Sequence, residues 1–225
     1  EFENSSALDT ALVIKVTELL IGTINKIGSA SLVVSGGRTP LAFFHLLSQQ
    51  VLDWSKVVVT LADERWVDAD HGDSNEKLVR ENLLINEAHA AEFIPLKNSA
   101  MDAVEGELQS ESDIESLGQF TVVILGMGDD GHTASLFPGA KTLALGIDMN
   151  SGRTAIAVMP TAAPHQRMTL TLPRLLDSQQ IILHIKGAGK QGVLQAAQKG
   201  DDITELPIRA ILNQHVAPLS IFWAK

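Results

Sequence analysis

The stretch from Ser31 to Pro40, with the sequence SLVVSGGRTP, contains a strand, a turn and the start of a helix in succession. Its first half, Ser31 to Ser35, predicts a short buried strand because apolar residues dominate it. Gly36 and Gly37 then permit a tight turn. Pro40 suits the first turn of a helix, where its missing N–H would have no partner. The stretch therefore predicts one strand–turn–helix unit.

The same alternation extends along the rest of the chain. We expect further strands at residues 56–61, 93–96, 120–125, 154–159, 180–185 and 219–223. We expect helices at residues 6–27, 40–50, 99–117, 187–198 and 207–213, and one near residue 74, where Asp73 and Glu76 resemble a capping box. Strands rich in Val, Ile and Leu that alternate with helices are typical of a mainly parallel sheet covered on both faces. The predicted fold class is α/β, a three-layer sandwich.

The composition favours one globular domain over residues 1–225, with 45% hydrophobic and 20% charged residues. The absence of cysteine excludes disulfides and thiolate nucleophiles. No apolar run reaches the ~18 residues that span a bilayer, and the N-terminus is acidic where a secretion signal would be basic. We therefore expect a cytoplasmic protein with no membrane partner, and a monomer, because no exposed apolar stripe is evident.

The net charge of −10 argues against a nucleic-acid partner, because nucleic-acid backbones bind through Lys and Arg. An anionic small molecule would need basic residues gathered locally against this overall sign. Four polar clusters supply such residues, and each follows a predicted strand: residues 35–39, 63–65, 126–132 and 187–190. Ligands of open parallel sheets bind beyond the carboxyl ends of the strands. If these strands are neighbours, the four clusters meet in one crevice.

The turn after the first strand has the features of a phosphate-binding loop. Gly36 and Gly37 let backbone N–H groups approach an anion, and the helix that follows adds partial positive charge. Ser35 and Arg38 flank the glycines, and Arg38 can add a fork of donors. The alternative is a tight strand-to-helix turn with a solvated arginine. We favour phosphate binding.

His132 is the candidate general base. It follows a glycine-rich loop with two carboxylates, Asp129 and Asp130, directly after a buried strand. A neutral imidazole can take a proton from water near neutral pH, and either carboxylate can orient it. The alternative is that His132 only caps the next helix.

Two other kinds of site are not supported. Gly126, Gly128 and Gly131 match the spelling of a dinucleotide fingerprint, but Asp129 and Asp130 stand where a pyrophosphate would bind. Pro138 and Gly139 also shorten the helix that this fingerprint requires. Residues 71–73, His-Gly-Asp, offer too few ligands to predict a metal site. We therefore predict neither a metal nor an organic cofactor.

The segment from Asp130 to Pro138, DGHTASLFP, resembles the corresponding motif of the 6-phosphogluconolactonase family. Residues 35–40, 63–67, 74–75 and 167–173 agree with the same family. The match runs from about residue 30 to the C-terminus, and the combination is more specific than any one segment. The resemblance implies a Rossmann-like α/β sandwich, shared with glucosamine-6-phosphate deaminases.

The resemblance also implies an activity and roles for residues. The activity is hydrolysis of a sugar-phosphate lactone, 6-phosphoglucono-δ-lactone, to 6-phosphogluconate in the pentose phosphate pathway without a cofactor. The expected catalytic residues are His132 as general base, Asp63 and Asp130. A lysine near the C-terminus would hold phosphate, with Lys190 as the better match and Lys186 as the alternative. The expected substrate-binding residues are Ser35, Gly36, Gly37, Arg38, Arg65, Gly128, Arg167 and Lys190. Amides of residues 36–37 or 128–131 are candidates for stabilising the oxyanion.

Three rival functions are less well supported. Glucosamine-6-phosphate deaminases continue their Asp-Gly-His motif with Ile-Ala-Phe-Asn-Glu-Pro, whereas residues 133–138 read Thr-Ala-Ser-Leu-Phe-Pro. A sugar-phosphate sensor of the transcription-regulator type would carry a helix-turn-helix segment, for which 225 residues leave no room. A nicotinamide dehydrogenase would rest on the glycine fingerprint alone.

Overall fold

A computed structural model describes residues 1–160 and 163–225. At its centre lies a six-stranded sheet with the order β4-β2-β1-β5-β8-β9, in which every neighbouring pair is parallel. Its strands are β1 (Ala30–Val34), β2 (Val57–Leu61), β4 (Glu92–Ile94), β5 (Val122–Leu125), β8 (Ile181–Lys186) and β9 (Leu219–Ala224). Each matches a strand expected from the sequence within a few residues.

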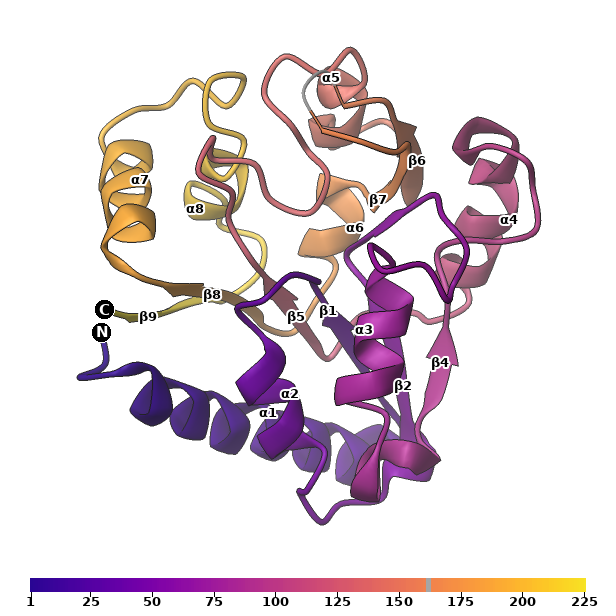
Figure 1. The fold of residues 1–225 in the computed structure, drawn as a ribbon, viewed down its shortest axis with the longest axis vertical. Helices are drawn as coiled ribbons and strands as arrows, with labels where there is room; N and C mark the ends of the chain where they lie inside the picture. Colours follow the sequence, from indigo (N-terminus) through magenta and orange to yellow (C-terminus); the bar gives the residue numbers. More distant parts are fainter. Residues whose placement is uncertain (161–162) are drawn as a thin grey trace.

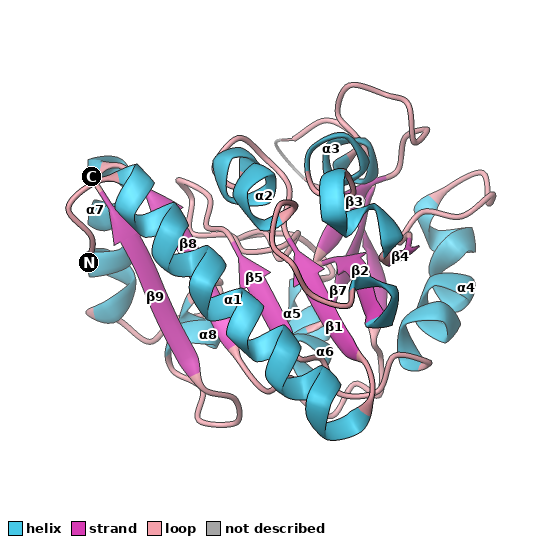
Figure 2. Cartoon of the chain, turned by 90° about the horizontal axis from the view of Figure 1, so that it is seen from below, coloured by secondary structure: helices cyan, strands magenta, loops and turns pink. Residues whose placement is uncertain are grey.

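Helices cover both faces of this sheet, which confirms the predicted α/β sandwich (Figures 1 and 2). One face carries α1 (Ser5–Ile27), α2 (Leu41–Leu47) and α3 (Asn75–Asn82). The other carries α6 (Leu172–Leu176), α7 (Ala188–Gln198) and α8 (Arg209–Leu212). The shorter elements are α5 (Leu143–Ile147), η1 (Trp54–Lys56) and η2 (Asn86–Ala90). None of the helices described is both long enough and apolar enough to cross a membrane.

A second, antiparallel sheet lies beside the first and has the order β3-β7-β6. It consists of β3 (Asp63–Arg65), β7 (Arg167–Leu170) and β6 (Ala155–Val158), and α4 (Ala103–Glu115) packs on it. The sequence predicted β6 but placed residues 63–65 in a loop and assigned no strand at 167–170. The polar residues of β3 form a strand because β7 pairs with them from far along the chain.

Two helix ends show how local sequence sets the boundaries. Gly28 ends α1 in the left-handed conformation, with φ of 93° and its N–H donating to the carbonyl of Ile24 at 2.8 Å. The prediction of a capping box at the start of α3 is wrong in its first residue. Ser74, not Asp73, caps the helix, and its hydroxyl accepts from the N–H of Lys77 at 3.1 Å. The side chain of Glu76 instead pairs with Arg80.

One cluster of buried apolar side chains joins the two sheets and α1. Leu32 and Val33 of β1 are fully buried at its centre, and Met168 and Leu170 of β7 extend it beneath the second sheet. Residues 1–225 as a single domain stay a prediction.

The order of the strands determines where a ligand can bind. From β1 the chain proceeds to β2 on one side, whereas β5 lies on the other side of β1. The connections that follow β1 and β5 therefore leave the sheet in opposite directions. Such a switch point opens a crevice at the carboxyl ends of the two strands.

Replacement of Leu32 by alanine tests the central packing. Leu32 is fully buried in β1 between β2 and β5. We expect a loss of about 2–5 kcal/mol in the free energy of unfolding measured with urea, because the substitution leaves a cavity. The matched control is Leu108→Ala on α4, where the leucine is 79% exposed and a change within about 0.5 kcal/mol is expected. Equal losses in the two variants would contradict this account of the core.

Candidate active site

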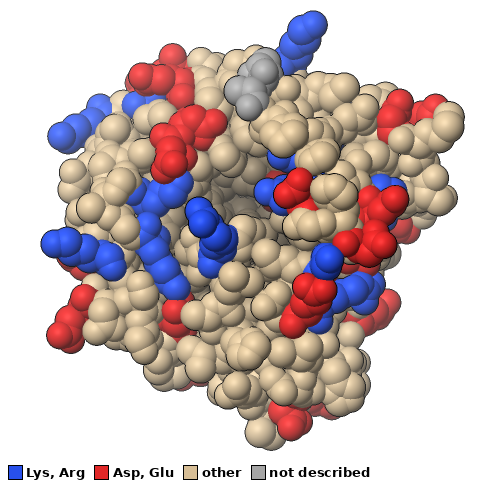
Figure 3. All heavy atoms as spheres, in the orientation of Figure 1, with Lys and Arg blue, Asp and Glu red and all other residues tan. Residues whose placement is uncertain are grey.

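A pocket opens where the sequence predicted a crevice, beyond the carboxyl ends of β1, β5 and β8. All four polar clusters contribute to its wall, through Ser35, Gly36, Gly37, Asp63, Arg65, Gly126, Gly128, His132 and Lys190. Figure 3 shows this hollow with both basic and acidic side chains around it. The wall of the pocket in this acidic chain thus includes two cationic side chains, Arg65 and Lys190.

The loop after β1 lines the pocket with two residues that have no side chain, Gly36 and Gly37. Gly37 has φ of 92°, which side chains rarely adopt. A Cβ on Gly36 would overlap the side-chain amide of Asn75, whose Nδ2 donates to the carbonyl of Asp63 at 2.9 Å. Ser35 ties the loop to β5, because its hydroxyl donates to the carbonyl of Ile124 at 3.1 Å. Glycine at both positions is thus a geometric requirement of this wall.

His132 and Asp130 form a close pair. The Nδ1 of His132 lies 2.5 Å from Oδ1 of Asp130, and the imidazole packs on Phe137 with ring centroids 4.4 Å apart. Gly128 is needed beneath the ring, since a Cβ there would overlap the imidazole. Burial raises the pKa of Asp130, but the charge and hydrogen bonds of His132 outweigh it and leave that pKa below its usual value. A carboxylate on Nδ1 holds the proton there and leaves the lone pair on Nε2.

The alternatives left open for this loop are resolved by contacts. The carboxylate of Asp129 pairs with Nζ of Lys190 at 2.7 Å and not with the imidazole. His132 caps no helix, because the next helix, α5, begins at Leu143. Because α5 begins only at Leu143, the helix that a dinucleotide fingerprint requires directly after Gly131 is not formed.

The two candidate lysines lie in different surroundings. Lys190, on α7, lines the pocket. Lys186, at the end of β8, donates to Oδ2 of Asp9 at 2.7 Å and to the carbonyl of Thr39 at 3.3 Å. Lys186 therefore holds the loop after β1, whereas Lys190 lines the pocket, and its role in binding phosphate stays a prediction.

Two expected arginines are absent from the pocket wall of the described chain. Arg38 is exposed and is not among the residues that line the pocket. Arg167 is buried on β7 directly opposite Arg65 of β3, and its Nη1 has no partner among the described residues. Burial, and then the charge of Arg65, lowers the pKa of Arg167. Their substrate-binding roles stay predictions.

Possible oxyanion donors differ between the two glycine segments. The N–H of Gly128 donates to the carbonyl of His132 at 2.8 Å, and that of Gly131 donates to the carbonyl of Gly128 at 3.2 Å. In the described part of the chain the amides of Gly36 and Gly37 donate to no protein group. Among the glycine amides of the two segments, those of Gly36 and Gly37 are therefore the free donors.

Sequence reasoning missed two residues that hold the site together. Glu64 is 1% exposed, and its carboxylate accepts from the N–H groups of Arg65, Asn75 and Glu76, each at 2.7 Å. It thereby fixes β3 to the N-terminus of α3. The hydroxyl of Ser135 donates to Oδ2 of Asp63 at 2.5 Å. Both lie inside family-like segments, which was the available signal, but their contacts depend on the tertiary fold.

A buried polar group lies beside the pocket. His184 of β8 lines it while only 2% exposed, with Nε2 3.5 Å from Oδ1 of Asp9 on α1. Its ring also packs edge-on against Phe43 of α2 at 6.0 Å. Burial lowers the pKa of His184, and the nearby carboxylate of Asp9 offsets this only in part. The imidazole is therefore held neutral.

Comparisons with known proteins agree with this architecture. The profile of the family described as glucosamine-6-phosphate isomerases/6-phosphogluconolactonase matches residues 3–223. A 6-phosphogluconolactonase of Rhizobium meliloti (strain 1021) is 46% identical over 99% of this chain and 97% of its own length. The crystal structure of a 6-phosphogluconolactonase from Shewanella baltica OS155 aligns with a TM-score of 0.94 at 45% identity, covering 100% of this chain and 96% of the other.

A putative 6-phosphogluconolactonase from Neisseria gonorrhoeae FA 1090 aligns with a TM-score of 0.92 at 38% identity, covering 100% and 97% of the two chains. The protein belongs to the glucosamine-6-phosphate isomerase/6-phosphogluconolactonase family. Within this family it is an enzyme of the 6-phosphogluconolactonase type, as the resemblance in its motifs predicted.

The neutral state of His184 predicts how stability depends on pH. The pKa of His184 is lower in the folded than in the unfolded chain, so the unfolded chain binds the proton more readily. Stability present above about pH 6.5 is then lost as the pH falls through the window below it. We expect the free energy of unfolding in urea to decrease on acidification, and to decrease less in His184→Gln.

The control for this experiment is His215→Ala, which removes an exposed histidine before β9. It should keep the pH dependence of the unmodified chain. If His184→Gln kept it as well, the buried imidazole would not be its source.

Proposed function

We propose that this enzyme hydrolyses 6-phosphoglucono-δ-lactone to 6-phosphogluconate in the oxidative branch of the pentose phosphate pathway, with His132 as the general base. The observation that carries the proposal is the His132–Asp130 pair, set in a pocket that also holds free backbone amides and basic side chains. The names of the relatives supply the substrate. A lactone is an activated ester, so a base and water suffice for its hydrolysis.

The proposed reaction begins at Nε2 of His132. This nitrogen takes a proton from water while the water oxygen attacks the lactone carbonyl carbon. The tetrahedral intermediate then collapses, the bond from that carbon to the ring oxygen breaks, and the imidazolium returns the proton to the ring oxygen. The negative charge of Asp130 stabilises the imidazolium between these two steps.

The loop after β1 is proposed to stabilise the intermediate. Negative charge gathers on the former carbonyl oxygen, and preorganised N–H donors lower the energy of that state. Gly36 and Gly37 offer such donors, whereas the amides of Gly128 and Gly131 are already engaged. Gly128 is instead proposed to give His132 the space it occupies.

Arg65 and Lys190 are proposed to bind the phosphate. Both line the pocket, and they approach it from separate elements, β3 and α7. Arg65 is held by a short hydrogen bond from Nη1 to the carbonyl of Asp73, at 2.5 Å. Fixing the phosphate orients the distant carbonyl toward His132, which lowers the barrier through proximity. Asp63 is proposed to act through Ser135, which it positions. A cytoplasmic location and a monomeric state remain predictions from the sequence.

The experiment is hydrolysis of freshly prepared 6-phosphoglucono-δ-lactone, coupled to oxidation of 6-phosphogluconate. We expect a rate above spontaneous hydrolysis, and a fall in kcat of about 10²–10⁴-fold in His132→Ala, because general-base catalysis is lost. His215→Ala controls for loss of an exposed histidine and should leave the rate unchanged. A folded chain without acceleration would refute the activity, and near-normal kcat in His132→Ala would refute the base alone.

Adjacent carboxylates allow a matched test of the orienting group. We expect Asp130→Asn to lower kcat at least about tenfold, because asparagine cannot balance the imidazolium and favours the wrong tautomer. Asp129→Asn should retain kcat, since Asp129 contacts Lys190 and not the imidazole. Steady-state kinetics on both variants separates kcat from KM. Equal losses of kcat would argue that neither carboxylate has a specific link to His132.

A further inference from the structure

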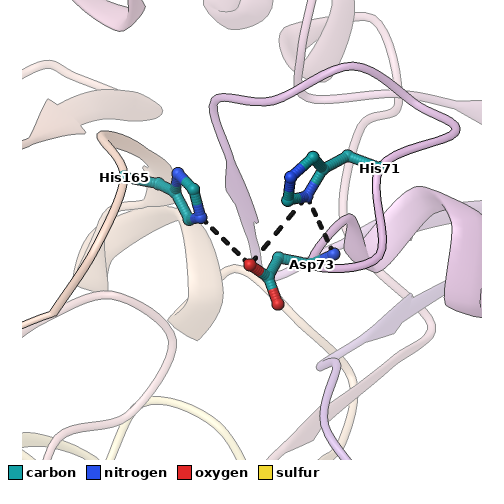
Figure 4. A group of neighbouring side chains, drawn as sticks. All are labelled: His71, Asp73 and His165. Carbon is teal, nitrogen blue, oxygen red and sulfur yellow. Dashed lines mark hydrogen bonds and ion pairs between the residues drawn. The ribbon is translucent and has the colours of Figure 1, made fainter.

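Three potential metal ligands converge outside the pocket wall. His71 and Asp73 lie on the loop between β3 and α3, and His165 reaches them from the segment that precedes β7 (Figure 4). One ring nitrogen of each histidine and a carboxylate oxygen of Asp73 all lie within 4.8 Å of one another. The fold thus brings a third potential ligand, His165, to the short segment of residues 71–73.

The distances are close to those of a bound ion. Oδ2 of Asp73 lies 3.0 Å from Nε2 of His165 and 3.9 Å from Nδ1 of His71. Bonds of about 2.0–2.1 Å in a tetrahedral zinc site place neighbouring donor atoms about 3.3 Å apart. Small side-chain rotations therefore suffice to bring the three donors around one ion.

The protonation states also suit a cation. Nδ1 of His71 accepts a hydrogen bond from the N–H of Asp73 at 3.0 Å, so this nitrogen carries a lone pair. Oδ2 of Asp73 faces Nε2 of His165, so a carboxylate oxygen already lies beside the third ligand.

The backbone holds His165 in an unusual conformation. Its φ is 67°, in the left-handed region that residues other than glycine seldom occupy. In this conformation the imidazole meets Asp73 and packs edge-on against the ring of His71, with centroids 5.4 Å apart. Strained residues of this kind cluster at ligand-binding positions.

The surrounding charge is mixed. The loop that carries His71 also contains Asp68 and Asp70, which add negative charge. Arg65 adds positive charge close to the three ligands. Its guanidinium donates a hydrogen bond to the backbone carbonyl of Asp73. His71 and Asp73 are about half exposed, so solvent can supply the remaining ligand.

We propose that His71, Asp73 and His165 bind one divalent transition-metal ion of the Zn²⁺ class, with water as the fourth ligand. Imidazole nitrogen and carboxylate oxygen are the donors that Zn²⁺ accepts in proteins, and three protein ligands leave one position open. The ion joins the loop before α3 to the segment before β7. The backbone carbonyl of Asp73 also accepts a hydrogen bond from Arg65, which lines the pocket. An ion bound to Asp73 therefore restricts the movement of Arg65.

The test is calorimetric titration of the metal-depleted full chain with ZnCl₂. We expect one equivalent to bind, and His71→Asn, Asp73→Asn and His165→Asn each to weaken the affinity at least about tenfold, since loss of even an outer-shell partner costs that much. Asparagine at residue 165 tolerates the positive φ. Zn²⁺ should also raise the melting temperature of the unmodified chain and not that of the variants.

Two controls locate the ion. His132→Ala and His215→Ala remove other imidazoles and should bind Zn²⁺ as the unmodified chain does. Loss of binding in His132→Ala with retention in His165→Asn would place the ion at the catalytic pair and overturn the proposal. Equal affinity in the unmodified chain and all three ligand variants would overturn it as well. Because the readout is metal binding, its outcome is independent of lactone hydrolysis.

Discussion

The parallel pairing of β1 with β5 is the constraint on which the site depends. Leu32 and Val33 of β1 lie in register with Val122 and Val123 of β5, while the opposite edge of β1 pairs with β2. The loops that follow β1 and β5 must then diverge, and a crevice opens between them. Backbone amides at the end of β1 and the histidine loop at the end of β5 face this crevice from opposite sides. The proposed oxyanion donors and the proposed general base are thereby brought together.

A second layer of buried polar contacts fixes the functional groups at this crevice. Glu64 joins the backbone of β3 to the start of α3, and Asp63 on the same strand binds Ser135 behind the histidine loop. Buried carboxylates are costly unless hydrogen bonds satisfy them, and these are satisfied largely by backbone N–H and hydroxyl donors. The small β3–β7–β6 sheet therefore serves as a support that presents Arg65 and holds Asn75 against the glycine loop.

The sequence predicted the crevice because each polar cluster follows an apolar run, and that order survives folding. It could not predict β3, because the segment Asp63–Arg65 is polar and forms a strand only by pairing with β7, which is distant in sequence. Adjacent residues that can both cap a helix, Asp73 and Ser74, are distinguished only by the backbone path. Lys186 and Lys190 likewise differ through a distant partner, since Asp9 of α1 engages the first of them. Choices among chemically equivalent neighbours are made by tertiary contacts.

The pairing of Lys190 with Asp129 is compatible with the proposed role of this lysine in binding phosphate. The side chain of Asp129 is 89% exposed, and that of Lys190 is 24% exposed. Ion pairs open to solvent contribute only about 0–1 kcal/mol, because water screens them. A phosphate dianion can therefore take Lys190 at small cost, while Asp129 returns to water. In the structure the same pair holds the lysine at the pocket wall, where the proposed phosphate site needs it.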